Sequence, residues 1–141
     1  MESIDQLASE IAACRRREQI GLSVRHAPIM NRGTGREILV VGIEPGNTEL
    51  QSGEAFSPSG LAGRRLVGWL IQAGIGNSRA EILKRTHMTS LCKCNIEKKS
   101  ELSRAAANCF PYLEKQIALL RPRVVVTVGV EPLKMLVRGT C

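Results

Sequence analysis

The sequence predicts an α/β fold in which helices cover both faces of a central parallel sheet. Two observations lead to this fold class. Short runs that are apolar throughout alternate with longer segments whose apolar residues recur at helical spacing. A continuous apolar run is typical of a strand buried on both faces, as in a parallel sheet, and the helices between the runs supply the crossovers that parallel strands need. The chain of 141 residues is expected to form a single domain over residues 1–141.

The first half of the chain is predicted to place one strand between two helices. Residues 4–17 form a helix, because apolar residues lie three and four positions apart on one face. Residues 20–36 are rich in glycine and form a loop or a short hairpin. The apolar residues 38–41 form the first strand, which leads into a polar loop that reaches Gly60. Helical spacing over residues 60–74 then indicates the second helix.

The second half is predicted to hold two more strands, each followed by a helix. Residues 87–92 form the second strand, and residues 101–120 form a long amphipathic helix with a kink at Pro111. Residues 124–128 form the third strand. Pro132 is placed as the first residue of a short last helix, where its missing N–H costs nothing.

The charge of the chain favours a polyanionic partner. Lysine and arginine number 20 against 13 acidic residues, which gives a net charge of +7 at pH 7. The basic residues cluster in three segments, and each alone is typical of a solvated face. Together we expect them to line a phosphate track. The segments are Arg15–Arg17, Arg64–Arg65, and Lys93 with Lys98 and Lys99. Aromatic residues make up only 3% of the chain, which argues against a wide stacking platform for single-stranded nucleic acid.

The sequence also predicts a cytoplasmic location without membrane contact. The N-terminus has no basic and apolar leader, and the apolar runs are too short to span a bilayer. The five cysteines cannot all pair within one chain. In a reducing compartment cysteines serve as ligands, nucleophiles or core residues rather than disulfides.

The candidate ligand site lies where the predicted strands end, since α/β sheets bind ligands at the carboxyl ends of their strands. The stretch Gly42–Gly46 makes a tight turn after the first strand, which is either a plain strand-to-helix connection or a close approach to a ligand. Glu44 and Glu49 are the carboxylates at this end, and either can orient or activate water. Phe56, in a loop rich in glycine, proline and serine, is either a stacking surface for a base or a core residue.

Several cysteines give a second candidate site. Converging thiolates in a reducing compartment indicate zinc or an iron–sulfur cluster. Cys94 and Cys109 lie fifteen positions apart in sequence number, with Cys14 far upstream and Cys92 two positions before Cys94. Cys109 lies on an apolar helix stripe, so burial in the core explains it equally well. From the residues alone both interpretations stay open.

Five motifs then follow one another along the chain, and the last is the most specific. They are Ile11-Ala12-Ala13-Cys14-Arg15-Arg16; Val40-Val41-Gly42-x-x-Pro45-Gly46-x-x-Glu49; Gly53-x-x-Phe56 leading to Ser59-Gly60; Thr89-x-x-x-Lys93-Cys94; and Cys109-x-Pro111 running through Pro122 into residues 124–129. With these motifs the chain resembles uracil-DNA glycosylases of the iron–sulfur family 4/5 type over nearly its whole length. The resemblance implies a three-layer α/β/α fold with its last strand missing.

The resemblance also implies a reaction and its residues. Such enzymes flip the nucleotide out of the helix and hydrolyse the bond between uracil and deoxyribose. We expect the chain to act as a monomer on uracil in single- or double-stranded DNA. By position, Gly42, Pro45 and Gly46 form the loop that positions water, Glu49 is its matching acid, and Glu44 lies one place after the position of a second family acid. Phe56 stacks on uracil, and Ser90 stands where the base edge is read.

The same resemblance implies an iron–sulfur cluster, expected to be 4Fe-4S. Cys14, Cys94 and Cys109 match three of its four ligands. Arg17 stands in place of the fourth, which leaves Cys92, His26 or a non-protein group to complete the cluster.

Three departures from the family pattern predict poor excision of uracil. Ile43 replaces an acid, Ser90 replaces the asparagine that reads the uracil edge, and the chain stops at Cys141, before the family's fourth strand and its histidine loop. A catalytically inactive nucleic-acid-binding member of the superfamily is therefore the first alternative. A small-molecule-binding α/β protein is the second.

Overall fold

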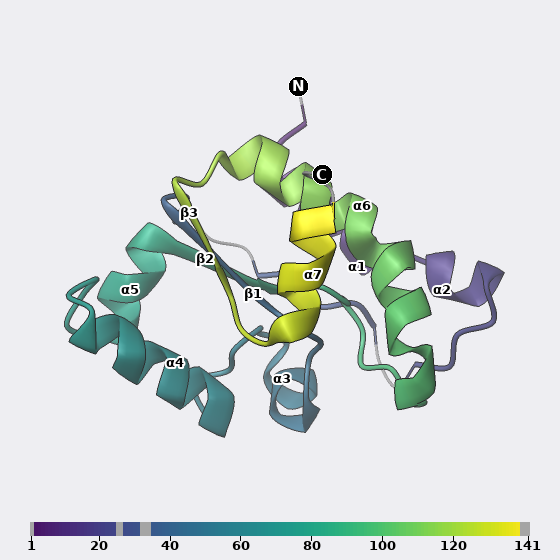
Figure 1. The fold of residues 1–141 in the computed structure, drawn as a ribbon, viewed down its shortest axis with the longest axis horizontal. Helices are drawn as coiled ribbons and strands as arrows, with labels where there is room; N and C mark the ends of the chain where they lie inside the picture. The colour runs from purple at the N-terminus through teal and green to yellow at the C-terminus, as the bar shows by residue number, and fades with distance from the viewer. Residues whose placement is uncertain (1, 25–26, 32–34, 139–141) are drawn as a thin grey trace.

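A three-stranded parallel sheet forms the centre of the protein (Figure 1). The computed structural model describes residues 2–24, 27–31 and 35–138. Strand β1 (Ile38–Gly42) lies in the middle, between β2 (Thr86–Ser90) and β3 (Val124–Thr127), in the order β2-β1-β3. Ile38 pairs with the first residue of each neighbour, so all three strands begin in register. The predicted α/β fold with a parallel sheet is confirmed.

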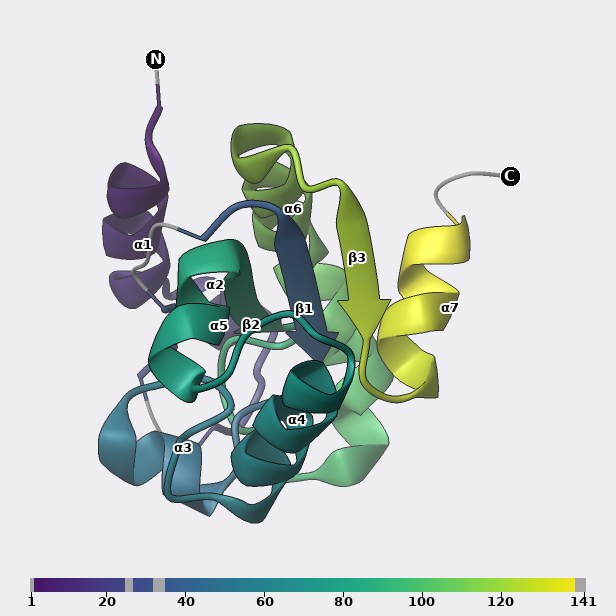
Figure 2. The ribbon, with the colours of Figure 1, turned by 90° about the vertical axis from the view of Figure 1, so that its left-hand side faces the viewer.

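Helices pack on both faces of this sheet, because successive residues of β1 point to opposite sides. Ile38 and Val40 belong to a cluster with helices α4 (Leu61–Gln72) and α5 (Arg79–Arg85). Leu39 and Val41 belong to a second cluster with helices α1 (Ile4–Ala12) and α6 (Leu102–Leu120). Figure 2 shows α4 and α5 in front of the sheet and α6 behind it. All five residues of β1 are buried, as its continuous apolar sequence predicts.

The predicted first helix over residues 4–17 is wrong at its end. Helix α1 begins with a capping box, in which the Ser3 side chain accepts from the N–H of Gln6 and the Gln6 side chain accepts from the N–H of Ser3. It stops at Ala12, and a separate short helix α2 covers Arg16–Gln19. Between them the backbone turns around Cys14, whose sulfur accepts a hydrogen bond from the N–H of Arg16 at 3.4 Å. This local sulfur contact interrupts the helix that the apolar spacing favours.

Two short helices lie where no helix was expected. Helix α3 (Asn47–Ser52) occupies part of the predicted polar loop, and α5 lies in a stretch without a predicted element. Side chains near their N-termini hold both: Glu49 bonds back to the first turn of α3, and the Ser78 hydroxyl accepts from the N–H of Glu81 in α5. Such local caps stabilise helices too short to show an apolar period.

The remaining boundaries differ from the prediction by a few residues. Strand β2 begins at Thr86 and ends at Ser90. The next two residues, Leu91 and Cys92, still donate their N–H groups to the carbonyls of Gly42 and Ile43 at the end of β1. After the short 3₁₀ turn η1 (Lys99–Glu101), α6 continues through Pro111 as one helix. Helix α7 covers Val130–Arg138 and so begins two residues before Pro132.

Strand β3 forms an open edge of the sheet. Val124 and Val125 are 52% and 38% exposed, whereas the whole of β1 is buried. Helix α7 packs against β3, beyond this edge in Figure 2. No helix within the described ranges is long and apolar enough to cross a membrane.

Candidate functional site

A cavity of about 280 Å³ opens at the carboxyl ends of β1 and β2. Its wall contains all seven residues that the sequence predicts for catalysis and substrate binding, contributed by segments up to 48 positions apart. They are Gly42, Glu44, Pro45, Gly46, Glu49, Phe56 and Ser90, and the rest of the lining is Ile43, Ala55, Ala62, Thr89 and Val128. The structure therefore brings these residues together in the place that a parallel sheet reserves for a ligand.

Phe56 lies against the end of β1. A Cβ atom placed on Gly42 would lie 2.8 Å from Cζ of the Phe56 ring, so only glycine permits this approach. Phe56 has a positive φ of 50°, a conformation that is uncommon for a residue with a side chain and often occurs at functional sites. The ring is half-buried, packs against the cluster under α4, and also lines the cavity. Both interpretations of this residue, core packing and ligand contact, thus describe part of its environment.

Helix α4 holds the Phe56 backbone in this conformation. A Cβ atom on Gly63 would lie 2.1 Å from the carbonyl oxygen of Ser57 and 2.4 Å from that of Phe56. Since both neighbours are backbone atoms, this contact fixes the loop against the first turn of the helix. The position of the aromatic ring therefore depends on a glycine that lies outside the cavity wall.

Glu49 joins the two loops that border the cavity. Its Oε2 accepts a hydrogen bond from the N–H of Gly46 at 3.0 Å, and its Oε1 accepts one from the N–H of Ser57 at 3.3 Å. A carboxylate that accepts from backbone amides forms stronger bonds than a neutral acceptor. Glu49 therefore acts first as a clamp between the glycine-rich turn and the Phe56 loop.

Glu44 is also engaged by neighbouring groups. Its Oε2 accepts from the N–H of Ile96 at 2.8 Å, and its Oε1 pairs with the ammonium of Lys99. The Glu44 side chain is only 15% exposed, so this pair ties the turn to the segment that follows β2. Neither carboxylate at the cavity is a free base.

Ser90 forms part of the cavity wall at the end of β2. Its hydroxyl donates to the carbonyl of Cys92 at 2.6 Å, which leaves the oxygen free to accept a hydrogen bond but not to donate one. Asn95 supports the opposite wall, because its Nδ2 donates to the carbonyl of Pro45 at 2.8 Å. Asn95 was not among the residues predicted for the site, although its position just after a strand end was an available signal.

Lys93 is buried, and its place on the expected phosphate track is wrong. The side chain is 1% exposed, and its ammonium donates to the Ser90 carbonyl and to Oγ1 of Thr89. Burial lowers the pKa of Lys93 to about 8, because the ammonium has lost its water. Lys93 therefore lies beneath the cavity floor, where it holds the end of β2.

The other basic residues do not form one track either. Figure 1 shows α2, which carries Arg16 and Arg17, and α4, which carries Arg64 and Arg65, at opposite sides of the molecule. The Arg17 guanidinium donates to the carbonyl of Cys14, and the Arg16 guanidinium lies 5.6 Å from the centre of the Tyr112 ring. The expectation of a continuous basic path is corrected: the arginines of α4 stand apart from those of α2.

His87 belongs to strand β2, and it does not line the cavity. It is buried beside Gln116, and Nε2 of Gln116 lies 3.3 Å from Nε2 of His87. Burial lowers the pKa of His87 to about 4, with smaller contributions from Lys93 and Arg36. His87 is therefore neutral at pH 7 and belongs to the core. His26 lies outside the described residues.

The three cysteines predicted as ligands border one small apolar cavity of about 20 Å³. Cys14 follows α1, Cys94 follows β2, and Cys109 lies on α6. Arg17 lines the same cavity, whereas Cys92 does not. The structure thus brings together three thiols from three separate elements.

These thiols have backbone hydrogen-bond donors nearby, but they do not form a ready site for a single metal ion. Backbone N–H groups of Arg16 and Lys93 donate to the sulfurs of Cys14 and Cys109, as they do for metal-bound thiolates. Burial raises the pKa of Cys94 to about 12 and raises that of Cys109, so these two thiols are protonated at pH 7. Within the part of the chain that the structure describes, no three His, Cys, Asp or Glu side chains lie close enough together to hold one metal ion.

Comparisons with known proteins place the chain in a family. The family model described as "Uracil DNA glycosylase superfamily" matches residues 32–140. A type-4 uracil-DNA glycosylase of Archaeoglobus fulgidus is 32% identical over 133 residues, which are 92% of this chain and 61% of that protein. Type-4 enzymes of Saccharolobus solfataricus and Sulfurisphaera tokodaii are 29% and 27% identical, again over 92% of this chain and over 56% of each relative. The chain therefore spans less than two thirds of the length of these relatives.

Proposed function

We propose, since the chain belongs to the uracil-DNA glycosylase superfamily, that it binds DNA and takes an unpaired uracil base into the cavity beside Phe56. One observation carries the proposal, namely the cavity of about 280 Å³ between the Gly42–Gly46 turn, the Phe56 ring and Ser90. Its volume equals that of about nine water molecules at about 30 Å³ each, which is enough for the eight heavy atoms of uracil. The site is a slot for one flat base.

The chemistry of the wall supports recognition of the base. The half-buried ring of Phe56 offers an apolar face for stacking. The Ser90 oxygen, whose proton is committed to Cys92, accepts a hydrogen bond and so suits the ring N–H of uracil. Ser90 offers no donor for a uracil carbonyl, which makes the reading of the base edge incomplete.

The proposed reaction is hydrolysis of the bond between uracil and deoxyribose, at a low rate. This reaction needs an oriented water and stabilisation of the departing uracil anion. Glu44 and Glu49 hold the loops through backbone N–H groups, and their remaining lone pairs are the acceptors at the cavity for a water. Among the described lining residues there is no imidazole and no side-chain amide. Loss of one donor to a developing anion costs about 10²–10³ in rate.

The test uses labelled single-stranded oligonucleotides that contain one uracil or one thymine. We expect tighter binding of the uracil strand by fluorescence anisotropy, loss of this preference in Phe56→Ala, and slow formation of alkali-labile sites. Ser90→Asn supplies an amide that both donates and accepts, so we expect it to raise the excision rate. Equal affinity for uracil and thymine strands, unchanged by Phe56→Ala, would contradict the proposal.

A nucleic-acid-binding member without catalysis is the second candidate function. The engaged state of both carboxylates favours it, because neither is a free base at the cavity. The same oligonucleotides separate the two functions: uracil-selective binding without any excision, even in Ser90→Asn, identifies the inactive form. Binding without selectivity for uracil rejects the uracil cavity and leaves only non-selective nucleic-acid binding.

We also propose that Cys14, Cys94 and Cys109 hold an iron–sulfur cluster. Their convergence from three elements and the N–H donors to two of the sulfurs support this proposal. Arg17, at the same cavity, cannot be a ligand, because guanidinium stays protonated. A bound cluster supplies a cross-link between α1, the end of β2 and α6.

Anaerobic purification with iron analysis and visible absorption tests the cluster. We expect iron to be lost in Cys94→Ser and retained in Cys92→Ser, because Cys94 lines the cavity and Cys92 does not. Wild-type protein without iron or visible absorption, prepared anaerobically, would contradict the assignment.

A further inference from the structure

The outer side of helix α4 carries a pair of arginines and the sole tryptophan of the chain. Arg64, Arg65 and Trp69 are all exposed, and Trp69 is 58% exposed. Among the described residues neither arginine forms an ion pair. Exposure of a large aromatic side chain beside unpaired guanidinium groups is typical of a binding surface rather than of a solvated helix.

The segment of the chain that carries this surface has charge of one sign only. From Ala55 to Ala80 the sequence contains arginines but no aspartate or glutamate. This segment includes the Phe56 loop and the whole of α4. A partner with a regular array of negative charges complements it, which is the property of a nucleic-acid backbone.

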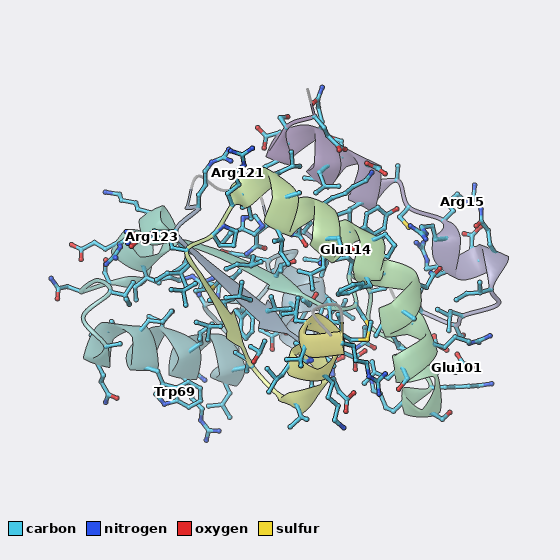
Figure 3. The ribbon with its side chains drawn as sticks, turned by 45° about the horizontal axis from the view of Figure 1, so that its top comes forward. Arg15, Trp69, Glu101, Glu114, Arg121 and Arg123 are labelled. Atoms are coloured by element: carbon cyan, nitrogen blue, oxygen red, sulfur yellow. The ribbon has the colours of Figure 1, made fainter. Side chains whose placement is uncertain are left out.

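The surface is continuous with the candidate cavity. Ala62, in the first turn of α4, lines the cavity, and Trp69 follows seven residues later. Seven residues make nearly two helical turns, so Ala62, Arg65 and Trp69 lie along one side of the helix, with Ala62 and Trp69 about 10 Å apart along its axis. Figure 3 shows Trp69 on the side of α4 that faces away from the sheet.

We propose that this side of α4 binds single-stranded DNA, with Trp69 stacked on a base next to a phosphate held by Arg65. The inference rests on the proposed function and extends it from the flipped base to its flanking strand. A distance of about 10 Å corresponds to about three nucleotides of a strand stacked as in a duplex, at 3.4 Å per step, and to fewer in an extended strand. Stacking on the indole needs an accessible base face, which a paired base inside a duplex does not offer.

The sole tryptophan makes the proposal directly measurable. Indole fluorescence reports on Trp69 alone, so the titration of a single-stranded oligonucleotide without uracil should quench or shift the emission at saturation. We expect Trp69→Ala to weaken binding of this strand about 5- to 150-fold, since base–aromatic stacking contributes about 1–3 kcal/mol. Trp69→Phe should retain most of the affinity, because phenylalanine also stacks.

Charge-matched arginine variants test the phosphate contacts. Arg65→Ala should reduce the slope of log affinity against log salt by about 0.7, the contribution of one phosphate on a single strand. Arg123→Ala removes the same charge from an exposed position just before β3. Figure 3 shows Arg123 away from α4, so this variant should leave the slope unchanged.

The outcomes distinguish this inference from the proposed function. Single-strand binding with unchanged Trp69 emission and unchanged affinity in Trp69→Ala overturns the role of α4 and leaves the base cavity standing. Absence of DNA binding at low salt overturns both.

Discussion

Substitution of Gly63 by alanine should displace the Phe56 loop without touching the cavity wall. The new Cβ would start 2.1 Å from the Ser57 carbonyl oxygen and 2.4 Å from that of Phe56, whereas ordinary contacts begin at 3.4 Å. Neither neighbour can turn away, because both are backbone atoms. Overpacking of this kind costs about 1–3 kcal/mol, and we expect the upper end here. Alanine recovers about 1 kcal/mol of helix preference, so the net loss should be about 2 kcal/mol.

Gly68→Ala is the matched control in the same helix. A Cβ on Gly68 meets no atom within 4 Å, so this variant should gain about 1 kcal/mol. Urea unfolding of both variants should thus give midpoints that move in opposite directions. Gly63→Ala should also lose preference for uracil strands, because Phe56 has moved. Equal stability of the two variants, with uracil preference intact in both, would refute the argument that α4 positions the aromatic ring.

Three further predictions concern the clamp, the core histidine and the thiols. Glu49→Gln should lower the free energy of unfolding by about 1–2 kcal/mol in urea titrations, because an amide nitrogen would face one of two backbone N–H donors. The free energy of unfolding should fall by up to about 3 kcal/mol as the pH drops from about 6.5 to about 4. The reason is that His87 takes up a proton at a higher pH in the unfolded chain than in the folded protein. His87→Gln should reduce this pH dependence. In metal-free protein at pH 7, Cys94 should react with iodoacetamide far more slowly than free cysteine. Burial raises the pKa of Cys94 to about 12, so its thiolate is scarce. Equal rates would contradict the burial of Cys94.

The sequence was sufficient for the parts of the fold that depend on a repeated pattern. The apolar run that begins at Ile38 predicted a strand buried on both faces, and β1 is buried at every residue. The long apolar stripe ending at Leu120 predicted α6. Short elements escaped because they depend on single hydrogen bonds: α3 has its Glu49 clamp, and α5 has the Ser78 cap. The Ser78-x-x-Glu81 spacing was a readable signal for the latter.

The candidate site was predictable in membership but not in detail. Strand ends and motifs placed Glu44 near Phe56, and the cavity brings them together. The sequence could not show that Glu44 is already paired with Lys99, because that contact spans 55 positions. Nor could it show the burial of Lys93, since a lysine in a polar stretch is usually exposed. Long-range contacts decided both cases.

The most direct test of the proposed function is a crystal structure with a uracil-containing single-stranded oligonucleotide bound. We predict that the uracil ring lies against Phe56, between the Gly42–Gly46 turn and Ser90, with a ring N–H directed at the Ser90 oxygen. A uracil base bound elsewhere, with the cavity beside Phe56 filled only by water, would contradict the assignment of this cavity.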